Sequence, residues 1–153
     1  MVAFNAQRNA SDSNSGVSVV NAEQNRLIMV VDDDDGARML IRRILELAGH
    51  TVLTASSGRA AIEHARTMGS NLALVVLDMV MPQMNGYATY QALQAVRPGL
   101  PFVLCSGACD HEHVSDLLRR GRCDFVPKPF TQAQLRFAVN RLLVCEGAPG
   151  GGV

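Results

Sequence analysis

The sequence lacks the features that would place the chain in a membrane, on a secretory route or on an acidic polymer. Its 14 Lys and Arg residues balance 14 Asp and Glu residues, so bulk charge gives no reason to expect binding to nucleic acid or to an acidic membrane surface. No apolar run approaches the roughly 18 to 20 residues that a membrane-spanning helix requires. The N-terminal stretch MVAFNAQRNASDSNSG has no apolar core like that of a signal peptide. We therefore expect a cytoplasmic protein that contacts neither membrane nor nucleic acid directly.

Cysteine pairs at metal-site or redox spacing are also missing. The four cysteines, Cys105, Cys109, Cys123 and Cys145, form no C-x-x-C motif and no zinc spacing. Three of the four sit in or beside apolar segments, where Cys acts as a small hydrophobe. Free thiols in a reducing compartment are the simple interpretation. The stretch CDHEH at residues 109–113 resembles a cluster of metal ligands, but no further partner at ligand spacing is evident. We interpret it as a polar turn that leads into a helix.

Composition indicates one globular domain with loose ends. Apolar residues make up 48% of the chain and charged residues 18%, as in an ordinary globular protein. Residues 1–25 are rich in Asn, Ser, Gln and Ala without periodicity, which predicts a flexible N-terminal extension. Residues 146–153 are dominated by Gly, which predicts a flexible tail. The ordered domain is expected to span residues 26–145.

Within that domain, short apolar runs alternate with helical patterns. Strands are predicted over 27–31 (LIMVV), 51–55, 73–77, 101–105 and 124–127. Apolar residues spaced three and four apart predict helices over about 37–48, 61–68 and 135–142, with further helices over about 87–96 and 112–120. This alternation predicts an α/β fold: a flavodoxin-like, doubly wound (βα)5 domain with a parallel five-stranded sheet in the order 2-1-3-4-5.

Polar side chains follow the predicted strands where each one ends. Asp32 and Asp33 follow the first strand, Asp78 the third, Ser106 the fourth and Lys128 the fifth. Parallel α/β sheets bind ligands beyond the carboxyl ends of their strands, at the point where the strand order reverses. In the order 2-1-3-4-5 these side chains are expected to share one crevice.

The residues of this crevice suit phosphoryl transfer. Three converging carboxylates need a cation, and oxygen ligands select a hard ion such as Mg²⁺. Asp78 could act as the nucleophile and form an aspartyl phosphate. The cation and Lys128 would neutralise the charge of the transferring group, and the Ser106 hydroxyl could donate to a phosphoryl oxygen.

The run of four aspartates is expected to divide into two pairs. Asp32 and Asp33 emerge directly from the strand and can reach the crevice. Asp34 and Asp35 lie at the entrance of the next helix, where one can cap it and both favour its positive dipole end.

The motifs VVDDDDGAR, LDMVMPQMNG, LCSG and VPKPF, in this order, resemble the receiver domain of two-component response regulators. The resemblance covers roughly residues 26–144. It implies that Asp78 is the phosphoacceptor and that Asp32 and Asp33 are the acidic pair that binds Mg²⁺, with Mn²⁺ as an alternative. It also implies that Asp78 and the backbone carbonyl of Val80 complete the protein ligands of that ion.

The same resemblance assigns the remaining site residues. Lys128 would be the catalytic cation, and the peptide bond between Lys128 and Pro129 is typically cis in this family. Ser106 matches the hydroxyl that turns inward when phosphate is present, and Phe125 matches the aromatic residue that moves with it. Gly107 resembles the small residue that leaves the phosphate accessible.

The chain departs from the family pattern at a few positions. Arg122, followed by Cys123, stands where the family usually has alanine, which puts the packing of the helix before it in doubt. Val80 and Ala108 are apolar at positions that influence the lifetime of the phosphoryl group. Because neither side chain can orient a water, slow self-dephosphorylation is a reasonable hypothesis.

Simpler explanations exist for single residues. Asp78 could be a loop or capping carboxylate, Lys128 a solvated lysine, Ser106 a helix cap and Phe125 plain core. Three arginines after the fourth predicted strand could be solvated surface or a partner contact: Arg119, Arg120 and Arg122.

The leading hypothesis is a phosphoacceptor switch, not a turnover enzyme, that receives its phosphoryl group from a histidine kinase or a phosphotransfer protein. It would signal to a downstream protein, or as a homodimer, through the surface formed by the helix over 112–120, the strand over 124–127 and the last helix. We expect either a free-standing receiver or a receiver fragment of a hybrid kinase. The alternatives are a non-phosphorylated interaction domain and a Mg²⁺-dependent phosphatase. A phosphatase of this kind would need a second acidic residue at the position of Val80.

Overall fold

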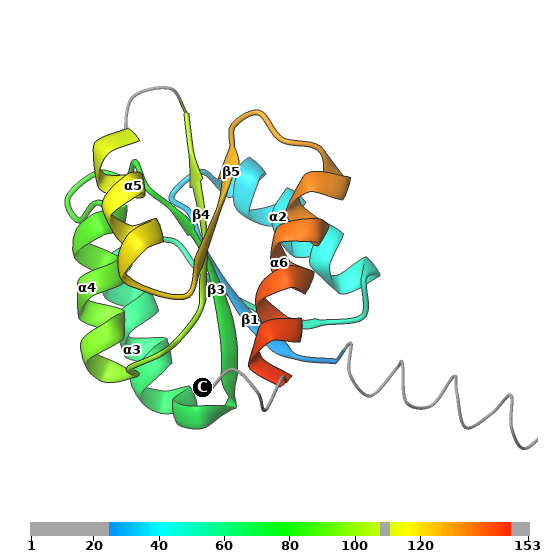
Figure 1. Cartoon of the computed structure of the whole chain (residues 1–153), viewed down its shortest axis with the longest axis horizontal. Helices are drawn as coiled ribbons and strands as arrows, with labels where there is room; N and C mark the ends of the chain where they lie inside the picture. The colour runs from blue at the N-terminus through cyan, green and yellow to red at the C-terminus, as the bar shows by residue number, and fades with distance from the viewer. Residues whose placement is uncertain (1–24, 108–110, 148–153) are drawn as a thin grey trace, which may run out of the picture.

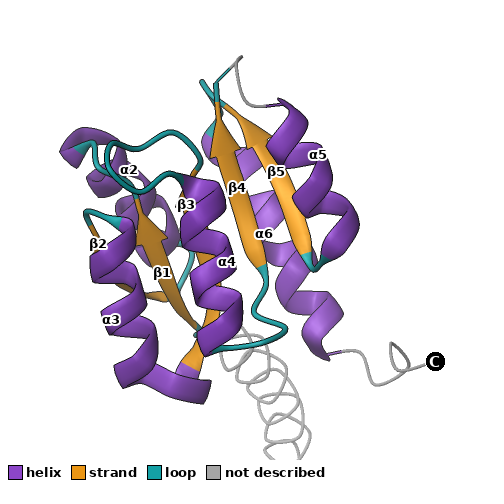
Figure 2. Cartoon of the chain, turned by 90° about the vertical axis from the view of Figure 1, so that its left-hand side faces the viewer, coloured by secondary structure: helices purple, strands orange, loops and turns teal. Residues whose placement is uncertain are grey.

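The computed structural model describes residues 25–107 and 111–147, and these residues form a parallel five-stranded sheet with the strand order β2-β1-β3-β4-β5. Helices α3, α4 and α5 cover one face of the sheet, and α2 and α6 cover the other (Figures 1 and 2). In chain order the elements are β1 (Leu27–Val31), α2 (Asp35–Leu47), β2 (Thr51–Ala55), α3 (Gly58–Met68), η1 (Gly69–Asn71), β3 (Leu72–Asp78), α4 (Gly86–Val96), β4 (Phe102–Ser106), α5 (His111–Arg120), β5 (Cys123–Pro127) and α6 (Gln132–Gly147).

The sheet separates two apolar cores because successive side chains of a strand point to opposite faces. In β1, Met29 and Val31 pack into the core under α3, α4 and α5, whereas Ile28 and Val30 pack into the core under α2 and α6. All seven residues of the central strand β3 are buried. Burial on both faces explains why these strands are apolar throughout, and the predicted fold is confirmed.

The helices begin and end where the sequence supplies suitable residues. Asp34 caps α2 by accepting the backbone N–H of Ala37 at 3.1 Å, and Ser57 caps α3 by accepting that of Ala60 at 3.1 Å. Gly49, just beyond α2, has a φ of 100°, a conformation that favours glycine after a helix. The predicted N-terminal extension and C-terminal tail lie largely outside the described residues.

Arg122 is accommodated without disturbing α5. Its guanidinium donates to the carbonyl of Leu142 in α6 at 3.1 Å and to that of Gly99 at 3.5 Å. Val114 and Leu117 of α5 remain 4% and 0% exposed, so this helix is packed against the sheet in spite of the departure at Arg122. Within the described residues, no helix has the length and apolar character needed to cross a bilayer.

We predict that Gly86→Ala lowers the free energy of unfolding by about 1–3 kcal/mol because the new methyl group overpacks the start of α4. A Cβ at this position would lie 2.5 Å from Cα of Met79 and 2.8 Å from the carbonyl oxygen of Asp78. Alanine usually favours helix over glycine, so the backbone clash must outweigh propensity. Urea denaturation measures the effect, with Gly107→Ala as the control, since nothing lies within 4 Å of a Cβ there. Equal losses in both variants would contradict the prediction.

Candidate functional site

Four strands deliver the predicted site residues to the carboxyl edge of the sheet. Asp32 and Asp33 directly follow β1, and Asp78 is the last residue of the adjacent strand β3. Ser106 ends β4, and its carbonyl accepts the backbone N–H of Lys128 at 2.8 Å.

 
This hydrogen bond continues the pairing of β4 with β5 as far as Lys128. The strand order therefore brings together the residues that the sequence places far apart.

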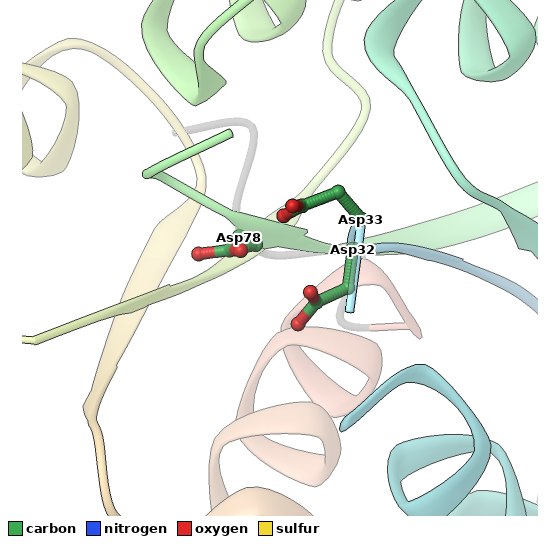
Figure 3. Close-up of side chains that lie close together, drawn as sticks. All are labelled: Asp32, Asp33 and Asp78. Carbon is green, nitrogen blue, oxygen red and sulfur yellow. The ribbon is translucent and has the colours of Figure 1, made fainter. Parts of the chain in front are cut away.

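The three carboxylates form a tight cluster (Figure 3). One oxygen from each of Asp32, Asp33 and Asp78 lies within 4.8 Å of the other two. Asp32 is 1% exposed and Asp78 is 6% exposed, whereas Asp33 is exposed. Burying like charges side by side is costly unless a cation is close to them.

Lys128 supplies the positive charge within the protein. Its Nζ lies 3.3 Å from Oδ2 of Asp32 and 3.3 Å from Oδ1 of Asp78. Partial burial acts to lower the pKa of Lys128, but the two carboxylates outweigh it and the pKa is raised above its ordinary value. The ammonium group is thus held in its charged form between the two buried acids.

Asp78 is the acid whose titration the site changes most clearly. Its pKa is raised to about 6, first by burial and then by the neighbouring Asp32 carboxylate. The Val80 backbone N–H, which donates to Oδ1 at 3.2 Å, and the Lys128 ammonium oppose this shift. Desolvation and like charge prevail, so without an added cation the Asp78 carboxylate is poorly stabilised.

The acidic run has a distinct contact for three of its four side chains. Asp32 accepts the backbone N–H of Asp34 at 2.9 Å, Asp34 caps α2, and Asp35 pairs with Arg38. Asp33 has no hydrogen-bond or ion-pair partner within residues 25–107 and 111–147. The prediction that one residue of the second pair caps the helix is confirmed for Asp34.

This donor set fits a hard divalent cation. All three clustered side chains offer carboxylate oxygens, which Mg²⁺ prefers and usually supplements with water. Asp33 is available without breaking any contact, and the oxygens are close enough for one hydrated ion to reach all of them. The carbonyl of Val80 stays a predicted ligand. Among the described residues no metal grouping includes Glu112 or His113, and Cys109 and Asp110 lie outside them.

The predicted switch residues occupy the positions that the motifs imply. Ser106 is 1% exposed, and its hydroxyl donates to the Gly107 carbonyl at 3.3 Å, so it does not act as a helix cap. Phe125 is partly buried against the core beneath α5. The peptide bond between Lys128 and Pro129 is cis, as the resemblance implied. The switching roles of Ser106 and Phe125 stay predictions.

Sequence reasoning missed Arg38, which lies against the acidic run. Its Nη1 donates to the backbone carbonyl of Asp32 at 2.8 Å, and its Nη2 pairs with Asp35. The available signal was the three-residue separation of Asp35 and Arg38, which places them on the same side of a helix. The contact with the Asp32 carbonyl had no counterpart in the sequence pattern.

We predict that, in metal-free buffer, the wild-type protein loses stability relative to Asp78→Asn as the pH rises from about 4 to about 7. Because the Asp78 pKa rises from 3.8 to about 6 on folding, the folded state binds the proton more tightly. This contribution is fully present at low pH and is lost as the pH rises through about 6. Urea denaturation of both proteins in EDTA measures the difference, and a difference independent of pH would contradict the raised pKa.

Comparison with known proteins finds similar sequences in two-component signalling. The chain is 34% identical over 116 residues to the sensor kinase CckA of Brucella abortus, where the match covers 76% of this chain and 12% of the kinase. It is 28% identical over 116 residues to the chemotaxis protein CheY of Thermotoga maritima, covering 75% of this chain and 95% of CheY. The chain thus spans a small part of the first relative and nearly all of the second.

A solved structure and a family model match the same part of the chain and indicate the same family. The crystal structure of the receiver domain of NtrX from Brucella abortus matches with a TM-score of 0.70 and 32% identity, covering 76% of this chain and 98% of that one. The family model described as the response regulator receiver domain matches residues 28–140. The chain therefore belongs to the receiver domain family of response regulators, whose members are signalling switches and not turnover enzymes.

Proposed function

We propose that this receiver accepts a phosphoryl group on Asp78 from a histidine kinase or a histidine phosphotransfer protein in a Mg²⁺-dependent reaction. The observation that carries the proposal is the position of Lys128 Nζ, 3.3 Å from both Asp32 and Asp78, at the edge of the sheet where Asp33 is uncommitted. A half-buried lysine between two buried acids provides the charges that phosphoryl transfer to a carboxylate requires.

The side chains have separate tasks in this reaction. An Asp78 oxygen attacks phosphorus while the P–N bond of the donor phosphohistidine breaks, and the departing imidazole nitrogen keeps the electron pair. Lys128 is close enough to Asp78 to move its ammonium group onto a transferred phosphoryl oxygen. Asp32, Asp33, Asp78 and the Val80 carbonyl would hold Mg²⁺, which when bound supplies further neutralisation of phosphoryl charge. The Ser106 hydroxyl would donate to the phosphoryl group after leaving the Gly107 carbonyl.

Two exposed apolar surfaces support docking of partner proteins. Near the site, the first half of α2 exposes Met39 (56%) and Leu40 (58%), which suits a phosphodonor that must approach Asp78. The second surface is formed by α5, β5 and α6 and contains a groove of about 470 Å³ between β5 and α6. Phe137 is 65% exposed beside this groove, which suits a downstream protein or a second copy of the chain.

The alternative functions lack an observation in their favour. A non-phosphorylated interaction domain would not need Asp32, Asp78 and Lys128 in mutual contact. A phosphatase would need an acid near Asp78, but Val80 places an apolar side chain there that is 62% exposed. The same side chain supports slow loss of the phosphoryl group, because it offers no group that orients a water. Residues 26–145 would act as the receiver in a free-standing protein or in a hybrid kinase.

We predict that acetyl phosphate with Mg²⁺ adds one phosphoryl mass to the wild-type protein and none to Asp78→Asn. The expected reason is that Asp78 is the nucleophile and that the amide cannot replace it. Intact-mass spectrometry measures the gain, and removal of acetyl phosphate then gives its lifetime, which we expect to be minutes or longer. No mass gain at saturating donor would favour the interaction domain, and continuous phosphate release would favour the phosphatase.

We also predict that Mg²⁺ raises the unfolding midpoint by relieving repulsion among the three clustered carboxylates. Asp32→Ala or Asp33→Ala is expected to weaken this response more than Asp35→Ala, because Asp35 contacts Arg38 and is not part of the cluster. Thermal unfolding with Mg²⁺ or with EDTA measures the response for each variant. An equal loss in all three variants would show that the division of the acidic run is wrong.

A further inference from the structure

Arg38 connects the two halves of the acidic run. It lies in the first turns of α2, and its Nη1 donates to the backbone carbonyl of Asp32 at 2.8 Å while its Nη2 pairs with the carboxylate of Asp35. The Arg38 side chain is only 15% exposed, although that of Asp35 is 87% exposed. The guanidinium is therefore packed against the turn between β1 and α2.

The contacts of Arg38 help to hold the turn between β1 and α2 in place. The Asp32 carboxylate is held by the Asp34 N–H and by Lys128, and the Asp32 carbonyl is held by Arg38. Because the next peptide unit begins at this carbonyl, its orientation determines where Asp33 projects. Asp33 is the one acid of the run left without a partner in the described parts of the chain.

We propose that Arg38 is a positioning residue for the divalent cation: it fixes the Asp32 carbonyl and holds Asp35 away, so that Asp33 faces the cluster. The inference rests on the proposed function, since it concerns the same cation. The planar guanidinium suits this task because it can donate to two acceptors in fixed directions, which a lysine ammonium cannot do as rigidly. Residues that orient metal ligands in this way typically contribute about 10- to 100-fold to metal affinity.

Charge and geometry predict opposite effects for the loss of this arginine. Removing a positive charge near a cation site removes Coulomb repulsion, and this effect alone would strengthen Mg²⁺ binding. Loss of the contact with the Asp32 carbonyl would instead weaken it, because the acidic turn would have to be ordered by the ion. The sign of the change in affinity therefore separates positioning from simple charge balance.

The test compares Arg38→Gln with Arg42→Gln in the full chain. Arg42 lies one turn further along α2 and pairs with Glu46 at 2.8 Å, so its loss also removes an arginine–carboxylate pair from this helix. Calorimetric titration with Mg²⁺ alone gives the dissociation constants, and thermal unfolding in EDTA gives the stability of each apo protein. A third variant, Arg38→Lys, keeps the positive charge but lacks the planar guanidinium that donates to two acceptors.

We expect Arg38→Gln to weaken Mg²⁺ binding by about tenfold, with Arg38→Lys between it and the wild-type protein and Arg42→Gln unchanged. Unfolding midpoints in EDTA should fall by similar small amounts in both glutamine variants. If Arg38→Gln binds Mg²⁺ as tightly as the wild-type protein or more tightly, or if Arg42→Gln weakens binding equally, the role of Arg38 is overturned. The proposed function would stand in either case. A wild-type protein that binds no Mg²⁺ would overturn the proposed function together with the role of Arg38.

Discussion

The structure depends on the placement of several negative charges at one edge of a parallel sheet. Because β1 and β3 are neighbours, their carboxyl ends bring Asp32 and Asp78 together, and both are almost fully buried. Two buried carboxylates repel each other and lose hydration, which costs far more than a surface pair can return. Lys128 offsets part of this cost, since its Nζ contacts both acids from the end of β5. The remaining imbalance appears as the raised pKa of Asp78 and favours binding of a cation.

The same constraint explains how the surrounding backbone is organised. Backbone hydrogen bonds hold the segments beside the charges: the Gly86 N–H donates to the Met79 carbonyl at 3.0 Å, and the Lys128 N–H donates to the Ser106 carbonyl at 2.8 Å. The close approach of Gly86 to Asp78 and Met79 keeps the loop after β3 tight. Rigid supports of this kind hold ionisable groups in positions that the groups themselves disfavour.

Much of the fold and the site could be predicted because both follow from periodic patterns. Runs such as LIMVV and ALVVL are apolar throughout because β1 and β3 are buried on both faces, and each strand lies within one residue of its predicted range. Asp32, Asp78 and Lys128 were identified because residues that follow parallel strands converge at one edge. Arg38 was missed since its contact with the Asp32 carbonyl depends on the angle at which α2 leaves the turn. The contacts of Arg122 with Gly99 and Leu142 join segments that no local pattern connects.

A change at Asp78 has two direct physical connections to the surface formed by α5, β5 and α6. Lys128 contacts Asp78 and immediately follows β5, so it links the acid directly to the strand that lines the groove. Tyr87, beside Gly86 in the first turn of α4, donates to Asp116 of α5 at 3.2 Å, and its ring contacts that of His113 in a tilted arrangement with centroids 4.9 Å apart. Contacts alone do not establish coupling, which needs an element with two arrangements that both sites bias. The Tyr87 side chain links α5 directly to α4, the helix that follows the loop after Asp78.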